Sequence, residues 1–331
     1  MTELRPLDWA SLGQQNLFVI CHASYELERS CFVTESLPEN VPVIGSLILA
    51  TSATLAIDEN YRKSLGRLRS ALSSWNRPDP AEIHASRSEL MLMLRKAEEH
   101  IGNLPGVAPT TFLLDISVFP KDRLWVLVDL LSRISPRSRV ALTYTEPEAY
   151  DTELSPGGWL SKGVVEVISL PGFNGRQDPS KRSLLILNTG HENERMTITV
   201  NNREPNVIVL LAQGQKQHSA LSRSAAARIV SKLREDYGSI VDQESLFDID
   251  SRDFLAVRSA IRHIYDVKQS EYNISVAFFG TKLQAIGALL ACQENRRIEA
   301  LYAQPQIYHR QKYSEGVGSS WMVTVLNGEP A

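Results

Sequence analysis

The chain has 331 residues, enough for two domains of ordinary size that each bury a core. Hydrophobic residues make up 43% and charged residues 22%, which is typical of a globular protein, and the net charge of −3 argues against a general nucleic-acid binder. The three cysteines have no Cys-x-x-Cys spacing, so we predict neither a disulfide framework nor a metal site, and we expect a cytoplasmic location. The polar N-terminus and the short apolar runs predict no signal peptide and no membrane span.

The first half of the chain alternates short apolar runs with segments of helical periodicity. Strands are expected at 17–21, 45–50, 112–116, 139–144 and 164–169, and helices at 58–75 and 82–101. Pro120 suits the first turn of a further helix, which is apolar almost all round at 124–131. The stretch Pro171 to Lys181 concentrates glycine, proline and polar residues, and it is the strongest boundary signal in the chain.

The second half repeats this order of elements. Strands are expected at 184–187, 206–211, 273–278, 298–302 and 322–326, and helices at 222–237, 251–267 and 283–292. Continuous apolar strands that alternate with helices indicate a mainly parallel sheet covered on both faces. We therefore predict an α/β fold with two Rossmann-like lobes, residues 1–172 and 182–331, joined by a linker at 173–181 and related by a pseudo-two-fold axis.

A Glu-x-Glu-Arg segment occurs once in each half. It reads CHASYELER at 21–29 and NTGHENER at 188–195, with all three charged residues at one offset of 166. Further matches follow at an offset of 158: Ile-Ser-Val at 116–118 and 274–276, and Pro-x-x-Tyr at 147–150 and 305–308. Because these offsets are close to half the chain length, we interpret the halves as a tandem duplication of one unit.

The repeated polar residues follow the ends of the first, third and fourth predicted strands of each lobe, where ligands bind in open parallel sheets. We predict that these residues bind a ligand in a cleft between the lobes. In the first lobe they are Glu28, Arg29, Ser117, Lys121, Tyr144, Tyr150 and Ser155, and in the second His191, Glu194, Arg195, Lys282, Tyr302, Tyr308 and Ser314. The structural alternative is that Glu and Arg form a salt bridge that fixes the loop, and that the tyrosines pack.

The chemistry of these residues predicts an anionic, nucleotide-like ligand. Arg29 and Arg195 offer a planar fork for phosphate or carboxylate. Lys121 and Lys282 both precede a predicted helix, where backbone N–H groups also favour an anion. The tyrosines can stack on a base.

The sequence Phe278-Phe279-Gly280-Thr281-Lys282, between a strand and a small-residue helix, resembles the Gly-Thr-Lys element of CRISPR-associated Rossmann-fold (CARF) and SAVED-like ligand-sensing domains. The resemblance implies two related lobes that bind a cyclic oligonucleotide at their strand ends, and a role in antiviral defence. In that case Gly280, Thr281 and Lys282 would contact the ligand, and a partner protein would carry the effector activity. The first lobe departs from the motif, since residues 118–121 keep only the lysine.

Three functional hypotheses remain open. The first is a sensor for a nucleotide-like small molecule, with no extended nucleic-acid surface and no membrane contact. The second is a hydrolase or glycosidase acting on a nucleotide or nucleoside, with Glu26 and Glu192 as catalytic carboxylates. The third is a scaffold subunit of a larger complex. The absence of GxGxxG, GxxxxGK[ST], GxSxG and HExxH motifs gives no support for a conventional dinucleotide or P-loop site, and the sequence indicates no cofactor.

Overall fold

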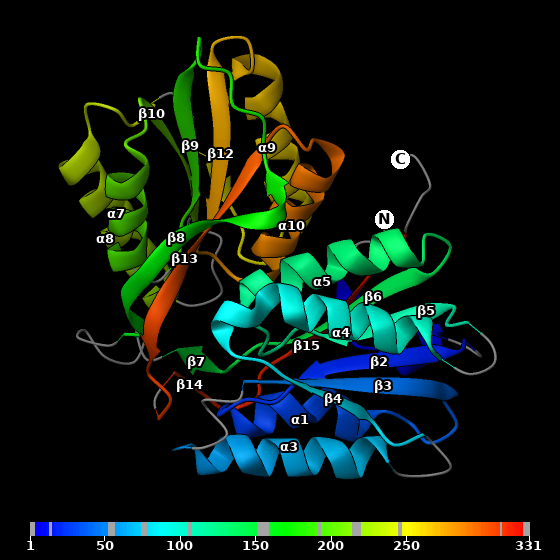
Figure 1. Ribbon diagram of the computed structural model, residues 1–331. Coiled ribbons are helices and arrows are strands. Elements are labelled where there is room, and N and C mark those ends of the chain that lie inside the picture. The colour runs from blue at the N-terminus through cyan, green and yellow to red at the C-terminus, as the bar shows by residue number, and fades with distance from the viewer. Residues whose placement is uncertain are drawn as a thin grey trace. The chain divides into compact units, whose positions relative to one another are not determined.

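The computed structural model describes residues 4–12, 15–51, 57–73, 78–104, 108–150, 159–190, 193–213, 220–243, 247–311 and 313–326. The chain divides into two compact units. Unit 1 comprises Met1–Glu148 and Ser314–Ala331, and unit 2 comprises Ala149–Tyr313. Both units are α/β with mainly parallel sheets, which confirms the predicted fold class (Figure 1). No helix in the described ranges combines the length and apolar character that a bilayer crossing requires.

The sheet of unit 1 has the order β1-β15-β6-β5-β2-β3-β4, with parallel pairing from β6 through to β4 and antiparallel pairing of β15. Its strands are β1 (Arg5–Pro6), β2 (Leu17–His22), β3 (Val43–Ala50), β4 (Ala81–His84), β5 (Thr111–Asp115), β6 (Arg139–Thr145) and β15 (Ser320–Leu326). Its helices are α1 (Leu27–Ser36), α3 (Glu59–Leu72), α4 (Leu90–Gly102) and α5 (Lys121–Ile134), with short 3-10 turns η1 (Trp9–Leu12) and η2 (Arg87–Glu89). Helices α1 and α3 cover one face of this sheet, and α4 and α5 cover the other (Figure 1).

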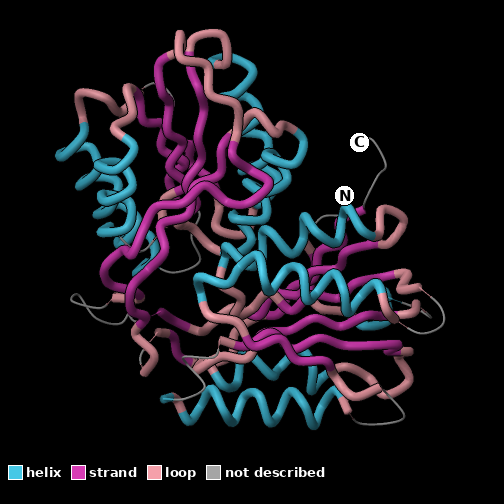
Figure 2. The backbone as a smooth tube through the Cα atoms, viewed as in Figure 1, coloured by secondary structure: helices cyan, strands magenta, loops and turns pink. Residues whose placement is uncertain are grey.

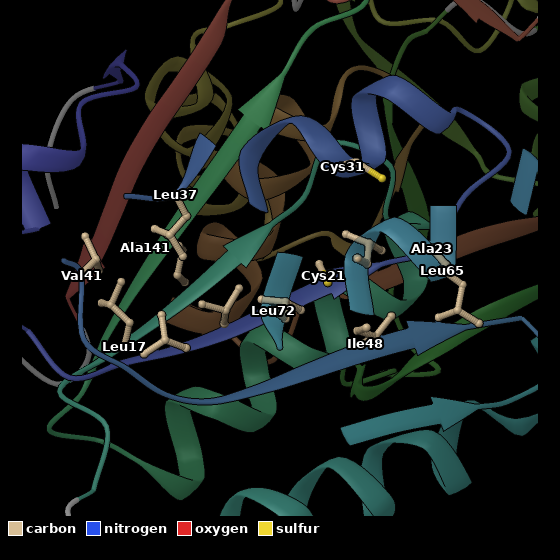
Figure 3. Packing of buried hydrophobic residues seen from close by; sticks show 14 of the residues in the cluster. Leu17, Cys21, Ala23, Cys31, Leu37, Val41, Ile48, Leu65, Leu72 and Ala141 are labelled. Carbon is tan, nitrogen blue, oxygen red and sulfur yellow. The ribbon is translucent and has the colours of Figure 1, made fainter. Parts of the chain in front are cut away.

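The core between the unit 1 sheet and its α1–α3 face explains the sequence pattern of these elements. Leu17 and Cys21 of β2 point onto this face, where they meet Leu65 and Leu72 of α3 (Figure 3). All six residues of β2 are buried, because helices cover both faces of the sheet. A strand buried on both sides reads as a continuous apolar run, which is why its sequence shows no alternation.

The sheet of unit 2 has the order β11-β10-β9-β12-β13-β8, and helices again flank it on both sides (Figure 2). Its strands are β8 (Ser161–Asn174), β9 (Arg182–Asn188), β10 (Val207–Gln213), β11 (Phe247–Ile249), β12 (Tyr272–Phe278) and β13 (Glu299–Tyr308). Its helices are α7 (Asn193–Arg203), α8 (Ala220–Tyr237), α9 (Phe254–Lys268) and α10 (Lys282–Glu294). Two further strands have two residues each, β7 (Ala149–Tyr150) in unit 2 and β14 (Ser314–Glu315) in unit 1.

The two sheets place successive strands in the same order. In chain order, β2 to β6 of unit 1 occupy the places that β9 to β13 occupy in unit 2. Each first strand, β2 or β9, lies between the second and the fourth strand of its sheet. The crossover connections therefore diverge to opposite faces beside β2 and β9, and we call these two places the switch points.

In each sheet, the fifth strand of the parallel series pairs with an antiparallel strand that comes from the other half of the sequence. Strand β8 precedes the second repeat yet pairs with β13 in unit 2, while β15 follows the second repeat yet pairs with β6 in unit 1. The units thus differ from the expected domains 1–172 and 182–331, and residues 175–181 lie inside unit 2. Strand β8 covers a row of backbone groups on β13, and β15 covers the corresponding row on β6.

Three local predictions were incomplete. Helices α1 and α7 include most of the two Glu-x-Glu-Arg segments, for which the sequence indicated a loop after a strand. These helices were missed because α1 buries Arg29, Ser30 and Cys31 rather than an aliphatic stripe. The helix expected at 82–101 is divided into strand β4 and helix α4, because the short strand follows Pro80 without an apolar run of its own.

Candidate functional site

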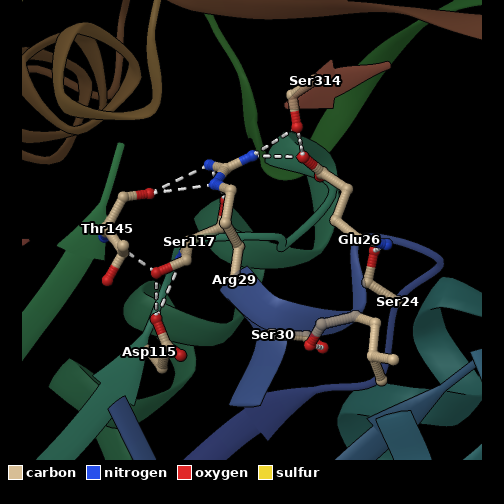
Figure 4. A network of polar contacts seen from close by, with 9 residues as sticks. Ser24, Glu26, Arg29, Ser30, Asp115, Ser117, Thr145 and Ser314 are labelled. Carbon is tan, nitrogen blue, oxygen red and sulfur yellow. Dashed lines mark hydrogen bonds and ion pairs between the residues drawn. The ribbon is translucent and has the colours of Figure 1, made fainter. Parts of the chain in front are cut away.

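Arg29 holds the carboxyl edge of the unit 1 sheet together (Figure 4). Its side chain is 2% exposed. Nε and Nη2 donate to the Thr145 carbonyl over 3.2 and 3.0 Å, and Nη2 also donates to the Ser117 carbonyl over 2.9 Å. Nη1 forms an ion pair with Glu26 and donates to Ser314 Oγ over 3.4 Å. All five N–H donors of the guanidinium thus have an acceptor within unit 1.

Ser117 belongs to the same bonded group. Its hydroxyl donates to Asp115 Oδ1 and accepts the Thr145 N–H over 2.9 Å, and the residue is fully buried. The structure therefore brings together four of the predicted site residues, Glu26, Arg29, Ser117 and Ser314. Because they satisfy one another, this geometry favours the structural alternative for the group in unit 1.

Arg195 has the corresponding place in unit 2. Its Nε and Nη2 donate to the Ala303 carbonyl over 3.0 and 2.5 Å, and the residue is 4% exposed. Ala303 lies in the fifth strand of its sheet, as Thr145 does in unit 1. Two aromatic rings flank the guanidinium, with Cζ 5.6 Å from the Phe279 ring centroid and 5.3 Å from that of Tyr302. Both arginines therefore tie the helix after the first strand to the end of the fifth strand.

The glutamates of the repeated segment face different surroundings. Glu28 lies on the exposed side of α1 and pairs with Arg67 over 2.8 Å, whereas Glu26 is held inside by Arg29. In unit 2, Glu194 accepts the Gly163 N–H over 3.2 Å. Glu26 and Glu28 are thus not assembled as a pair for acid–base work. The predicted residues Ser155, His191 and Glu192 lie outside the described residues.

Four tyrosines form a row in unit 2. The Tyr302 and Tyr308 hydroxyls are 3.3 Å apart, and the Tyr308 ring meets the Tyr313 ring edge-on with centroids 6.0 Å apart. Tyr313 in turn meets Tyr150 in the same manner at 6.1 Å. The sequence predicted three members of this row but missed Tyr313, which has no counterpart in the repeat. Tyr144 is separate from the row, buried in the unit 1 sheet.

The Gly280-Thr281-Lys282 segment begins helix α10. Thr281 is the N-cap: its Oγ1 accepts the Gln284 N–H over 3.2 Å, while Gln284 Oε1 accepts the Thr281 N–H over 3.0 Å. A Cβ on Gly280 would lie 2.0 Å from Gln284 Oε1, so this cap requires glycine there. Lys282 is the first helical residue and is 9% exposed, at the end of the helix that favours an anion. Lys121 begins α5 in the same way.

Asn188 is a candidate site residue that sequence reasoning missed. It ends β9 at the unit 2 switch point, opposite Phe278 of β12, and is 1% exposed. Neither Oδ1 nor Nδ2 of its carboxamide has a hydrogen-bond partner within the described part of the chain. A buried polar group without a partner costs about 1–3 kcal/mol, so a molecule or water that hydrogen-bonds to this carboxamide would stabilise the folded protein. The signal for it was the offset of 166, which aligns Asn188 with His22.

At the unit 1 switch point, His22 occupies the same position and has two partners. Its Nε2 lies 3.2 Å from Arg123 Nη1, and its Nδ1 lies 2.6 Å from a backbone carbonyl. Because a guanidinium only donates, Nε2 accepts and Nδ1 carries the proton, which defines a neutral imidazole. Arg123 also donates to the carbonyls of Ala85 and Ser86, and the Phe119 ring packs 5.2 Å from the imidazole. This switch point is filled by its own side chains.

Comparisons with known proteins give a local family match and a likeness of fold. Residues 184–308 match the family model described as "HFX_2341_N:-like, N-terminal". A solved structure of a Type III CRISPR defence DNA nuclease activated by cyclic oligoadenylate is 10% identical, with 91% of this chain and 67% of that chain covered and a TM-score of 0.52. This likeness shows the fold, and it agrees with the resemblance to CRISPR-associated sensing domains at that level.

Two other solved structures are more distant. A LacI family transcriptional regulator from Mycobacterium smegmatis is 12% identical, covers 84% of this chain and 73% of its own, and has a TM-score of 0.26. The cytoplasmic domain of a prokaryotic cation chloride cotransporter is 11% identical, covers 90% of this chain and 99% of its own, and has a TM-score of 0.27. Neither score supports an argument about function. A comparison with curated proteins gives no match.

Proposed function

We propose that the protein is a ligand sensor of a defence system that binds an anionic, nucleotide-like molecule at the carboxyl edge of the unit 2 sheet. The observation that carries this proposal is an aromatic series at that edge. It begins at Phe279, next to Gly280-Thr281-Lys282, and continues from Arg195 and Tyr302 along the tyrosine row to Tyr150. Aromatic faces beside a helix N-terminus suit a base and its phosphate.

The chemistry of unit 2 divides the recognition among the aromatic series, Lys282 and Asn188. We assign the phosphate contact to Lys282, because it is the first residue of α10 and a helix N-terminus favours an anion. The Asn188 carboxamide offers both a donor and an acceptor, which suits the edge of a base. The predicted cleft between the lobes and the duplication of the halves stay predictions.

The structural neighbour guides the choice of ligand and partner. Its description names cyclic oligoadenylate as the activator of a nuclease, so cyclic oligoadenylates are the first ligands to test. We propose that a separate protein carries the effector activity and that the protein works in the cytoplasm. The three cysteines described as free thiols, all buried, agree with a reducing compartment.

Thermal-shift titration of the full chain tests this proposal. The ligands are cyclic oligoadenylates, their linear counterparts and ATP, and the variants are Lys282→Ala and Lys282→Glu. Loss of a charge-assisted hydrogen bond of about 1.5–3 kcal/mol weakens binding by one to two orders of magnitude, and glutamate adds repulsion. Lys232→Ala on the exposed part of α8 is the matched control, since that lysine pairs only with acidic residues of its own helix.

Two outcomes contradict the proposal. Equal stabilisation of wild type and Lys282→Glu by one ligand places the lysine outside the site. No stabilisation by any of these ligands favours the scaffold hypothesis. Mass spectrometry of the recovered ligand separates a sensor, which returns it intact, from a hydrolase, which does not.

A further inference from the structure

Unit 2 contains a cavity at the amino edge of its sheet, opposite the carboxyl edge described above. The cavity has a volume of about 260 Å³. Its walls are the segment that connects β8 to β9, the last turn of α9, the start of β12 and the turn before β13. Strand β9 spans seven residues, or roughly 23 Å, so the cavity and the candidate site are well separated.

The backbone around this cavity is fixed by hydrogen bonds. The Arg176 N–H donates to the Arg297 carbonyl over 3.1 Å. Asp178 N–H donates to Asn273 Oδ1 over 2.8 Å, and Asn273 Nδ2 donates back to the Asp178 carbonyl over 2.8 Å. Gly175 turns the chain out of β8 with a φ of +66°, and a Cβ there would lie 3.0 Å from the Arg297 carbonyl. These hydrogen bonds therefore fix the backbone positions of the residues that line the cavity.

Two arginines at this cavity have uncommitted side chains. Neither the Arg176 nor the Arg297 guanidinium donates a hydrogen bond or forms an ion pair to any described residue, although their backbones are bonded to each other. Neighbouring arginines differ. Arg182 pairs with Glu271, and Arg296 donates to the Gly172 carbonyl. Because both arginines line one cavity, their two guanidinium groups can bind a single anion together.

The other charged groups of the cavity are already engaged. Lys181 Nζ donates to the Gln269 carbonyl at the end of α9 over 2.7 Å. Asp178 Oδ1 accepts the N–H and the hydroxyl of Ser180 over 3.0 and 2.7 Å, which keeps the pKa of this carboxyl below its usual value. The carboxylate thus stays ionised, and two arginines and one lysine against one aspartate leave the lining with a net charge of +2.

In a second cavity nearby, the arginine of the lining has an ion-pair partner. It has a volume of about 290 Å³, shares Asn273 with the first and is lined by Arg203. Arg203 forms an ion pair with the buried carboxylate of Glu299, which also accepts the Ser275 hydroxyl over 2.8 Å. The described lining of this second cavity contains no positively charged side chain without an ion-pair partner, so we assign the anion site to the first cavity.

We propose that the cavity at Arg176 and Arg297 binds a phosphate-bearing small molecule. Guanidinium groups match the geometry of phosphate oxygens, and Tyr265 and Tyr272 give the cavity an aromatic wall for an organic part. The volume is just below the range of about 300–1,000 Å³ typical of small-molecule sites, so the occupant is a mononucleotide or smaller. The site is independent of the proposed sensor function, because it lies at the other edge of the sheet.

Isothermal titration calorimetry of the full chain with inorganic phosphate, AMP and adenosine tests the proposal. We expect phosphate and AMP to compete for one site and adenosine not to bind. Arg176→Gln and Arg297→Gln should each weaken phosphate binding about tenfold, and the double variant should abolish it. Arg262→Gln is the matched control, because Arg262 lies on α9 outside the cavity lining, where it pairs with Glu294.

The outcomes separate this site from the proposed sensor site. Phosphate binding that survives in Lys282→Glu and fails in the double variant supports the cavity. No binding of phosphate or AMP to wild type overturns the proposal, as does a double variant that binds like wild type. An equal loss in Arg262→Gln also overturns it, because that result indicates only a general positive surface. Both substituted residues are exposed, so unchanged near-ultraviolet circular dichroism is expected for each variant.

Discussion

The two switch points share one scaffold and differ in chemistry. In unit 1, His22 and Arg123 are bonded to each other and to backbone carbonyls, with the Phe119 ring against the imidazole. In unit 2, Asn188 stands in place of His22, and its buried carboxamide has no partner within the described residues. The same strand order therefore carries a hydrogen-bonded side chain at the switch point of unit 1 and a buried carboxamide without a described partner at that of unit 2.

The arginines after the first strands also differ in their described surroundings. Arg29 uses all its donors on Thr145, Ser117, Glu26 and Ser314, whereas Arg195 lies between two aromatic rings. In unit 1 the polar groups around Arg29 hydrogen-bond to one another. In unit 2 two aromatic rings and the Asn188 carboxamide lie in the corresponding region. Both units share the hydrogen bonds from this arginine to the carbonyl at the end of the fifth strand, whereas the other residues around the arginine differ between the units. We therefore place ligand recognition in unit 2.

The largest expected effect comes from removing β15, the antiparallel strand between β1 and β6 in unit 1. A chain that ends at Ser319 lacks β15, whose Met322 and Val323 are buried and whose backbone pairs with all of β6. We expect unit 1 to unfold while unit 2, which keeps β8, stays folded. Hydrogen exchange should show fast amides in β2 to β6 and protected amides in β9 to β13.

A chain shortened only by residues 327–331 is the control for that truncation, and its exchange should match wild type. Protected amides throughout unit 1 in the longer truncation would show that β15 is dispensable. Fast amides in both units would show that the two units fold only together.

The exchange of antiparallel strands between the two halves also marks the limit of what the sequence predicts. Buried strands were found because apolar runs such as Leu184–Leu187 depend on local composition. The partner of an edge strand depends on contacts far apart in the chain, and the sequence of β8 does not specify whether it joins β6 or β13. Likewise, the local sequence does not show that the guanidinium of Arg29 is hydrogen-bonded and that of Arg176 is not hydrogen-bonded to any described residue. The hydrogen-bond partners of a side chain depend on the tertiary structure around it.

The second largest effect separates the two repeated arginines. Arg29→Ala leaves Glu26 buried without its counter-ion, and such a loss typically costs about 3–5 kcal/mol. Arg195→Ala removes bonds to one carbonyl and contacts with two rings, and we expect about 1.5–3 kcal/mol. Urea unfolding gives both values. The double variant Glu26→Ala/Arg29→Ala should recover part of the loss, and equal costs for the two single variants would remove the distinction.

A smaller effect of opposite sign is expected at the switch points. Asn188→Leu replaces an unpartnered carboxamide by an apolar group of similar size, so the free protein should gain about 1–3 kcal/mol. His22→Leu should lose a comparable amount, because Arg123 is left without one of its acceptors. Urea unfolding without ligand measures both changes. Destabilisation by Asn188→Leu would mean that the carboxamide already has a partner, and the case for recognition at Asn188 would fail.

The effect that is smallest near neutral pH concerns the buried thiols, of which unit 1 has two and unit 2 one. Burial raises the pKa of Cys21, Cys31 and Cys292 in the folded protein, so folded thiols keep protons that unfolded thiols release. Their contribution to stability is therefore complete below the unfolded pKa of about 8.5 and is lost as the pH rises above it.

Each thiol that stays protonated in the fold should contribute a slope of about 1.4 kcal/mol per pH unit above that point. In Cys292→Ala, the unfolding free energy should fall less steeply between about pH 8 and about pH 10, by about 1.4 kcal/mol per pH unit. Cys21→Ala/Cys31→Ala should reduce it by more, though by less than twice as much, because the Ser30 hydroxyl and Arg67 partly offset the rise at Cys31. Urea unfolding in the presence of a reductant measures these slopes. An unchanged slope in Cys292→Ala would show that this thiol reaches water in the folded protein, contrary to its complete burial in α10.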